Sequence, residues 1–360
     1  MGTAGTAATA GPSGTYERRS ASDATGCALL GVCAAWTLIT AGVHGGRPEG
    51  VLLAVLAVAA GYAGGRICGA LLPVAAPCAG ALVGVGLAAA APQLSPDPVS
   101  AAPLGHTGAT AALLILASGA ACSAAWAARG PSARLAMRLL AVGVMVAAAV
   151  LGSVAGFVAC AGILLCSLAT ALMRRRVFGL AGLALATAVV TALTWAIADD
   201  VLPEGLSASL EGQLDGHRVQ LWQDALALSG REPALGVGPG RFADASPTVA
   251  EHLLADGKPH SALWQQAAEQ GLVGVGLLAA VFCWLLYALY RSPRSTQVVL
   301  SAGAALTALA SVASVGNALS LTAVTTGAGY LAGIATARPL GDEQAQIRPP
   351  GSAPWTGGGG

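Results

Sequence analysis

The sequence predicts an all-α polytopic membrane protein with about ten transmembrane helices and one long extracytoplasmic loop that contains short helices. Three observations lead to this class. The 360 residues are 55% hydrophobic and only 10% charged, so the ionisable side chains are too few to coat a water-soluble globule of this size. The apolar residues form runs of about 20, the length that crosses a bilayer as a helix. The arginines gather in alternate connections between these runs.

The membrane spans are read from the apolar runs. The run from Leu139 to Met173 is too long for one span, and Gly152 and Ser153 divide it into two short ones. The expected spans are residues 26–44, 51–65, 67–92, 107–128, the two halves of 139–173, 177–198, 271–290, 297–316 and 319–337.

The orientation follows from the arginines, because positive residues stay preferentially on the cytoplasmic side. Alternating from a cytoplasmic N-terminus, the cytoplasmic segments carry most of the basic residues, namely Arg18, Arg19, Arg66, Arg129, Arg134, Arg138, Arg174, Arg175, Arg176, Arg291, Arg294, Arg338 and Arg348. One span fewer in the 139–173 run would place the triple arginine outside, which the rule disfavours. We therefore expect a multi-pass plasma-membrane protein with both termini in the cytoplasm.

The chain then divides into five parts. Residues 1–25 are rich in small and polar residues and predict a disordered cytoplasmic tail, as do the Gly- and Pro-rich residues 338–360. Residues 26–198 hold the first seven membrane helices, and 271–337 hold the last three. Between them lies the extracytoplasmic loop, 199–270, which contains most of the acidic residues. A connection of this length is usually functional or disordered.

Two function classes are disfavoured by charge and cysteine usage. The net charge of +1 argues against a nucleic-acid partner, which would need a clustered basic surface. The eight cysteines lie in apolar stretches, where small packing residues are expected, and their spacing predicts neither a disulfide framework nor a zinc site.

The loop has the texture of folded structure. Residues 217–229 place Val219, Trp222, Ala225 and Leu226 at helical spacing and are followed by Gly230, which predicts an amphipathic helix on the membrane surface or on the span ends. A glycine-rich turn at 236–240 comes next. A second helix is expected to start near Pro259 and stop near Gly271, and the two tryptophans of the loop, at 222 and 264, are expected to anchor in the headgroup layer.

This ordered pattern resembles the O-antigen ligases and the related O-antigen and exopolysaccharide polymerases, whose fold is of the C-type glycosyltransferase kind. The resemblance covers about 60 residues and is carried by Arg218, Trp222, Ala225, Leu226, Pro233, residues 236–240, Phe242, His260, Glu269, Gly271 and Gly274. Two departures are Ser261, where the family most often has Asn, and a span count below that usual for the ligases.

The resemblance implies transfer of a glycan from a polyprenyl-diphosphate carrier to an acceptor hydroxyl at the outer face of the membrane, with no metal and no cofactor. Arg218 and His260 match the family's essential arginine and histidine. The implied partners are the lipid-linked glycan donor, membrane lipid, and an acceptor that is a glycan, a lipid or a wall polymer. A glycan acceptor would make the protein a polymerase, and the others would make it a ligase.

The chemistry of these residue types fits that reaction. A diphosphate leaving group gathers negative charge as the sugar bond breaks, and a guanidinium such as that of Arg218 can bind two of its oxygens. The acceptor hydroxyl must lose a proton, and an unperturbed histidine side chain titrates at about 6.5, close to working pH. His260 is therefore the candidate base. Arg241, beside the glycine-rich turn, is a candidate for a second phosphate contact, followed by Arg231 and Lys258. The chain has no Asp-x-Asp sequence of the kind that holds a cation in nucleotide-sugar transferases.

Two alternatives remain open at this stage. A flippase or exporter of lipid-linked glycan would place ionisable residues within the spans and show two related halves. A non-catalytic membrane scaffold would bind a partner through the loop and would tolerate substitution of both Arg218 and His260.

Overall fold

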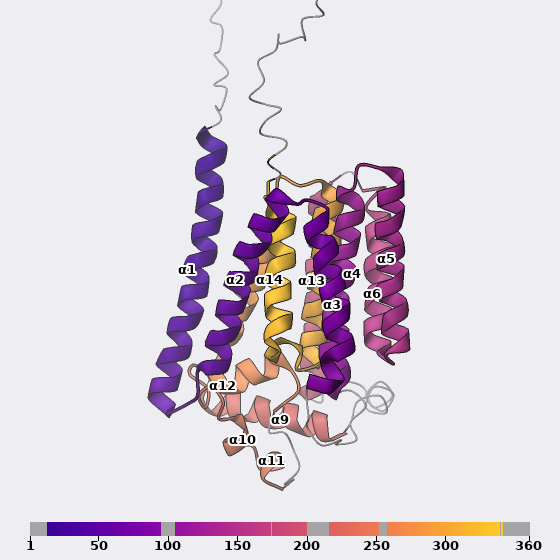
Figure 1. Cartoon of the computed structure of the whole chain (residues 1–360). Coiled ribbons are helices and arrows are strands. Elements are labelled where there is room, and N and C mark those ends of the chain that lie inside the picture. Colours follow the sequence, from indigo (N-terminus) through magenta and orange to yellow (C-terminus); the bar gives the residue numbers. More distant parts are fainter. Residues whose placement is uncertain are drawn as a thin grey trace, which may run out of the picture.

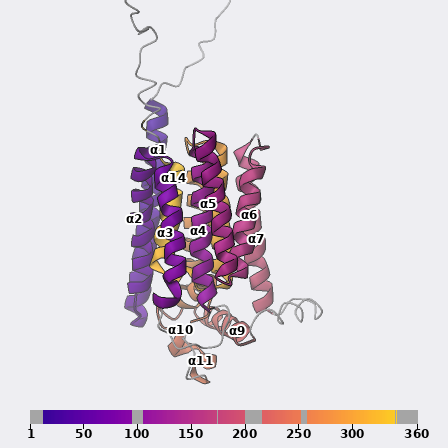
Figure 2. The same cartoon turned by 45° about the vertical axis from the view of Figure 1, so that its right-hand side comes forward.

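The computed structural model describes residues 13–94, 105–173, 175–199, 216–251, 258–338 and 340, and every element within these ranges is a helix. Long helices run side by side in a bundle, and short ones gather at one of its ends (Figures 1 and 2). The bundle helices are α1 (Ser13–His44), α2 (Glu49–Leu71), α3 (Ala75–Leu94), α4 (Gly105–Ala127), α5 (Pro131–Val150), α6 (Val154–Ala169), α7 (Arg176–Ala198), α12 (Ala262–Tyr290), α13 (Thr296–Val315) and α14 (Thr322–Thr336). The others are α9 (Gly216–Arg231), α10 (Phe242–Ala245), α11 (Pro247–Glu251) and the 3-10 helix η1 (Ala318–Ser320).

Seven of the described helices are long and apolar enough to cross a membrane. They are α1 from Ser22 on, α2, α4 from Gly108 on, α5, α7, α12 and α13. The apolar part of α3 (Ala75–Ala90), α6 and α14 are shorter. An all-helical membrane protein is therefore supported, whereas the count of ten spans remains a prediction.

The helices differ in how far the protein covers them. In the most apolar stretch of α4, 89% of the residues are buried, against 11% in α7. The exposed residues of α7 include Phe178, Leu185 and Val189. Water would penalise so large an apolar surface, so the outer helices suit a lipid environment around a core built on α4 and α13.

Helices α2 and α14 pack closely because glycines face backbone across their contact. A Cβ on Gly61 or Gly65 of α2 would strike the backbone of Thr326 or Tyr330, and one on Gly329 or Gly333 of α14 would strike the backbone of α2. Small residues four apart let two membrane helices approach closely and gain dispersion contacts. This contact brings the C-terminal helix against the second one.

The predicted division of the long apolar run is confirmed. α5 ends at Val150, Gly152 has φ +70°, and α6 begins at Val154. The hydroxyl of Ser153 accepts a hydrogen bond from the amide of Gly156 at 3.2 Å, which caps the new helix. A positive φ costs glycine little, so the chain can turn here between two antiparallel helices.

Several helix boundaries differ from those expected. α1 starts at Ser13, inside the segment expected to be a tail, while 1–12 and 341–360 lie outside the described residues. α2 extends to Leu71, so Arg66 lies in a helix rather than in a connection. α5 begins at Pro131 and carries Arg134 and Arg138 in its first turns. Long arginine side chains reach polar groups from within a helix end, which lets apolar helices run past them.

The two ends of the bundle carry different parts of the chain. α1 begins and α14 ends at the same end, whereas α9, α10 and α11 lie at the opposite end (Figure 1). This arrangement agrees with termini on one side and a loop on the other. Which side is the cytoplasm stays a prediction from the arginines.

Candidate functional site

A second, smaller apolar core lies where α9 packs against the start of α12. It contains Leu221, Trp222, Phe242 and Trp264. The two tryptophans are 0% and 2% exposed, so the prediction that they anchor in the headgroup layer was wrong. Their rings fill the space between α9 and α12, which joins the described loop helices into one folded cap on the bundle.

The predicted amphipathic helix is confirmed as α9, and Arg218 lies in its first turn. The Arg218 side chain is buried, with the residue 6% exposed, and its Nη1 donates to the carbonyl oxygen of Val315 at 3.1 Å. Val315 is the last residue of α13. Carbonyls at a helix C-terminus carry partial negative charge and lack helical partners, so they offset part of the cost of burying the guanidinium.

The turn at His260 is held by hydrogen bonds on both sides. Trp222 Nε1 donates to the carbonyl of Pro259 at 2.9 Å, and Ser261 Oγ donates to the carbonyl of Ser314 at 2.7 Å. The Ser261 hydroxyl also accepts from the amide of Trp264 at 3.4 Å and caps α12, close to the predicted helix start. His260 itself has φ +49° and is the one non-glycine residue with positive φ in the described part of the chain. Such a conformation persists only where the surroundings enforce it.

Arg218 and the His260 turn meet at the same helix end. Arg218 and Ser261 donate to the carbonyls of the consecutive residues Val315 and Ser314, although 42 residues separate Arg218 from His260 in the sequence. The structure therefore brings Arg218 and the turn that contains His260 to the C-terminal end of α13. Asn317, the residue before η1, follows two residues after Val315.

Sequence reasoning did not find Ser314 and Val315. Both contribute backbone carbonyls, which have no side-chain signal in a sequence. Ser261 was treated as a departure from the family pattern, yet its hydroxyl both caps α12 and ties the turn to α13.

The glycine-rich turn lies against a kink in α12. Gly236, Gly238 and Gly240 all have positive φ, and so does Gly271, where α12 bends. The amides of Val237 and Gly238 donate to the carbonyls of Ala268 and Glu269 at 2.8 and 2.9 Å, and the amide of Leu272 donates to Pro233 at 2.8 Å. The predicted stop near Gly271 is thus a kink that receives this turn.

The side chain of Glu269 also contributes to the contact between the glycine-rich turn and α12. The residue is 3% exposed, and its carboxylate accepts from Gln265 Nε2 at 3.4 Å and from the backbone of Gly240 and Phe242. A buried carboxylate is stable only when hydrogen bonds replace its lost hydration. Glu269 therefore acts as an anchor for the glycine-rich turn.

Arg241 contacts the connection between α1 and α2. Its Nη1 donates to the carbonyl of His44 at 2.6 Å, and its Nε lies 3.6 Å from a carboxylate oxygen of Asp244. The amide of Arg47 in turn donates to Pro239 at 2.7 Å. These contacts tie the glycine-rich turn to the α1–α2 hairpin and do not bring Arg241 to the end of α13.

The other two basic candidates lie in different places. Arg231 is exposed at the end of α9. It lies about 20 Å along the helix axis from Arg218, by the rise of 1.5 Å per residue. Lys258 is exposed, two residues before His260, and its charge acts on Glu269. Lys258 is therefore the one closer to the His260 turn.

The fold and these residues define a class, an all-helical protein of the membrane type with a folded cap on one end of the bundle. The chain matches no protein-family model, no curated protein and no solved structure. The case for a particular activity rests on the chemistry of the residues at the end of α13.

Proposed function

We propose that the protein transfers a glycan from a polyprenyl-diphosphate carrier to an acceptor hydroxyl at the extracytoplasmic face of the membrane. One observation carries the proposal. Arg218 and the turn containing His260 are fixed to consecutive carbonyls at the end of α13, through Val315 and Ser314. A cation and an imidazole are the two groups that this transfer requires.

Arg218 stabilises the leaving group. The bond between the anomeric carbon and the diphosphate oxygen breaks, and both electrons leave with the diphosphate. The guanidinium of Arg218 offsets this charge through charge-assisted hydrogen bonds. Because Arg218 is only 6% exposed, water screens the interaction little.

His260 acts as the base. The acceptor hydroxyl attacks the anomeric carbon with an oxygen lone pair, and its proton passes to an imidazole nitrogen of His260 as the new glycosidic bond forms. Bonds from Trp222 to Pro259 and from Ser261 to Ser314 hold the residues on either side of His260. A base held in position loses less entropy on reaching the transition state.

Lys258 and Arg241 take secondary roles. Lys258, two residues from His260, adds positive charge near the diphosphate. Arg241, bonded to the α1–α2 connection at His44, secures the glycine-rich turn instead of contacting phosphate. Arg231 lies too far along α9 to take part, which makes it a suitable control.

The test uses two conservative substitutions in cells. Arg218→Lys keeps the charge but loses the planar fork, and His260→Asn removes the base while tolerating the left-handed backbone. Loss of such groups lowers transfer by about 100-fold, so undelivered lipid-linked glycan should accumulate on the outer leaflet. Arg231→Lys, on the same helix, should leave delivery unchanged.

Two outcomes would count against the proposal. Full glycan delivery by both variants at normal protein levels would favour the scaffold alternative. Accumulation of the lipid-linked glycan on the inner leaflet would favour the flippase alternative, because a flippase acts before transfer.

A further inference from the structure

A basic hollow lies at the end of the bundle opposite the cap. It has a volume of about 40 Å³ and lies between the start of α1 and the ends of α2, α12 and α14. Its charged lining residues are Asp23, Arg66, Arg291 and Arg338. Neither Arg218 nor His260 lines it, so the proposed transfer does not explain it. We infer that this hollow binds the phosphate of an anionic phospholipid headgroup.

The first argument is charge. Among the lining residues that the structure describes, three arginines face one carboxylate, an excess of two positive charges around a small volume. Arg66 Nη1 binds Asp23 at 2.5 Å, so Asp23 occupies the position on Arg66 that a phosphate would take. A phosphate entering the hollow replaces Asp23 on Arg66 and meets Arg291 and Arg338.

The second argument is preorganisation. Tyr62 lies 5.9 Å from the guanidinium carbon of Arg66 and packs against the ring of Trp284 at 5.2 Å between centroids. Its hydroxyl donates to Asp23 at 3.4 Å and accepts from Thr336 at 3.3 Å. Arg66 is therefore held directly by Asp23 of α1 and Tyr62 of α2, and contacts from α12 and α14 hold Tyr62 in turn. Binding an anion there orders few further groups.

The third argument is the apolar surface beside the hollow, which selects a lipid over a soluble anion. Ile67 on α2 and Tyr287 on α12 are 61% and 50% exposed, and Tyr290 is exposed just before Arg291. Tyrosines favour the boundary between headgroups and acyl chains. A phospholipid can place its phosphate in the hollow and its chains along these exposed faces. Basic pockets between membrane helices bind acidic headgroups in this way.

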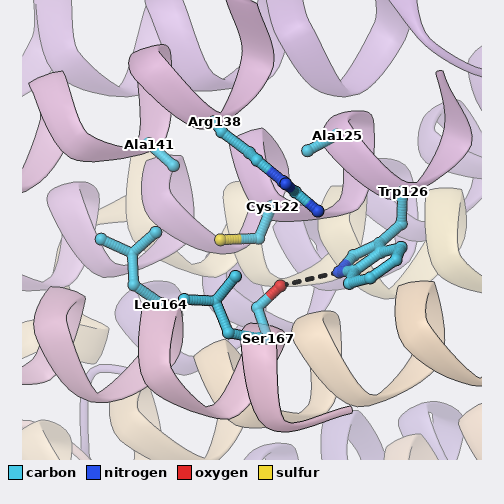
Figure 3. Close-up of a pocket in the computed structure, with 8 residues that line it drawn as sticks. Cys122, Ala125, Trp126, Arg138, Ala141, Leu164 and Ser167 are labelled. Atoms are coloured by element: carbon cyan, nitrogen blue, oxygen red, sulfur yellow. Dashed lines mark hydrogen bonds between the residues drawn. The ribbon is translucent and has the colours of Figure 1, made fainter. Parts of the chain in front are cut away.

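A second hollow at the same end of the bundle has fewer arginines in its lining (Figure 3). It has a volume of about 20 Å³ and is lined by one arginine, Arg138, whose guanidinium lies 5.6 Å from the ring of Trp126. Trp126 in turn donates to the hydroxyl of Ser167 at 2.9 Å. A single arginine offers less positive charge to a phosphate than three arginines do.

The test measures lipid binding by the full-length protein purified in neutral detergent. Native mass spectrometry reports the apparent affinity for phosphatidylglycerol and for phosphatidylcholine. Because one arginine near a membrane surface contributes about 1 kcal/mol, or roughly fivefold in affinity, Arg291→Gln should weaken phosphatidylglycerol binding about fivefold. Asp23→Asn should strengthen it, because the competing carboxylate is removed.

Matched controls separate the site from general surface charge. Arg134 on α5 lies at the same end outside the hollow and donates to the carbonyl of Ala128 at 3.1 Å. Arg134→Gln should leave phosphatidylglycerol affinity unchanged. Thermal unfolding of each variant checks that it is folded. If Asp23 had a structural role alone, Asp23→Asn would not bind phosphatidylglycerol more tightly.

Three results would overturn the inference. Phosphatidylglycerol and phosphatidylcholine carry the same phosphate and differ in net charge, so equal affinity for the two would show that the anionic charge of the headgroup is not recognised. Equal competition by glycerol 3-phosphate would assign the hollow to a soluble anion and exclude the lipid. Weaker binding by Asp23→Asn would mean that Asp23 contributes to the site instead of competing with the ligand. None of these results depends on glycan transfer.

Discussion

Gly271 of α12 faces the carbonyl of Ala234, and a Cβ at position 271 would lie 2.5 Å from that oxygen. The same residue has φ +66°, and the amide of its neighbour Leu272 donates to Pro233. Both the space and the backbone conformation therefore require glycine where α12 bends to receive the glycine-rich turn.

We expect Gly271→Ala to loosen the cap from the bundle. The backbone conformation of Gly271, φ +66° and ψ −167°, is one that essentially only glycine adopts and costs an alanine about 1–3 kcal/mol, and the clash with Ala234 adds to it. Limited proteolysis should cut residues 233–241 faster than in the parent protein. Gly276→Ala is the control, because the same helix carries Gly276 with nothing within 4 Å of its Cβ position. Equal protection of both variants would contradict the argument.

Close packing of α2 on α14 predicts that substitutions of two adjacent glycines, Gly64 and Gly65, differ in their effect on stability. A side chain at Gly65 would strike the backbone of Tyr330, whereas Gly64 has nothing within 4 Å. Gly65→Leu should destabilise the protein by about 1–3 kcal/mol or more through overpacking, and Gly64→Leu should have little effect. The midpoint temperature of heat-induced aggregation in detergent measures the stability of both variants. A larger loss of stability in Gly64→Leu than in Gly65→Leu would show that the contact between α2 and α14 is misassigned.

The membrane helices were largely predictable from the sequence because their signal is local. Apolar runs of sufficient length mark a helix wherever they occur, and Gly152 breaks the long run as expected. The helix ends were less predictable. Arg66 reads as a connection in the sequence, but Asp23 on another helix accepts its guanidinium and lets α2 continue past it.

The candidate site was predictable only in part. Arg218 and His260 were marked by residue type and order, whereas their meeting point is made of the carbonyls of Ser314 and Val315. A backbone carbonyl can belong to any residue, so no sequence pattern reports it. The burial of Trp222 was missed for a related reason, since an amphipathic helix suits a membrane surface and a second layer of protein equally well.

The bond from Trp222 to Pro259 makes Trp222 a positioning residue for His260. Trp222→Phe keeps most of the buried ring but leaves the carbonyl of Pro259 without its indole donor, which costs about 1–3 kcal/mol. We expect lower stability and, under the proposed function, slower glycan transfer. Trp195→Phe on α7, where Trp195 is 53% exposed, serves as the control. If Trp222→Phe kept wild-type glycan transfer and stability, Trp222 would not be a positioning residue for His260.

Comparing two serines at helix starts, Ser261 and Ser295, measures how much the N-cap of α12 contributes to stability. Ser261 is the N-cap of α12, and its hydroxyl binds both the amide of Trp264 and the carbonyl of Ser314. Ser295 is the N-cap of α13 and makes no side-chain cap bond. Ser261→Ala should therefore cost about 2 kcal/mol, the sum of a lost cap and a lost hydrogen bond, whereas Ser295→Ala should cost little.

Asparagine at position 261 tests whether the cap or the bond to α13 matters more. An Asn side chain can cap α12 as well as Ser does, and its amide can still donate to a carbonyl. We therefore expect Ser261→Asn to retain more thermal stability and more glycan delivery than Ser261→Ala. If the two variants behave alike, the hydroxyl contact with Ser314 has a geometry that an amide cannot reproduce, and the cap alone does not hold the His260 turn in place.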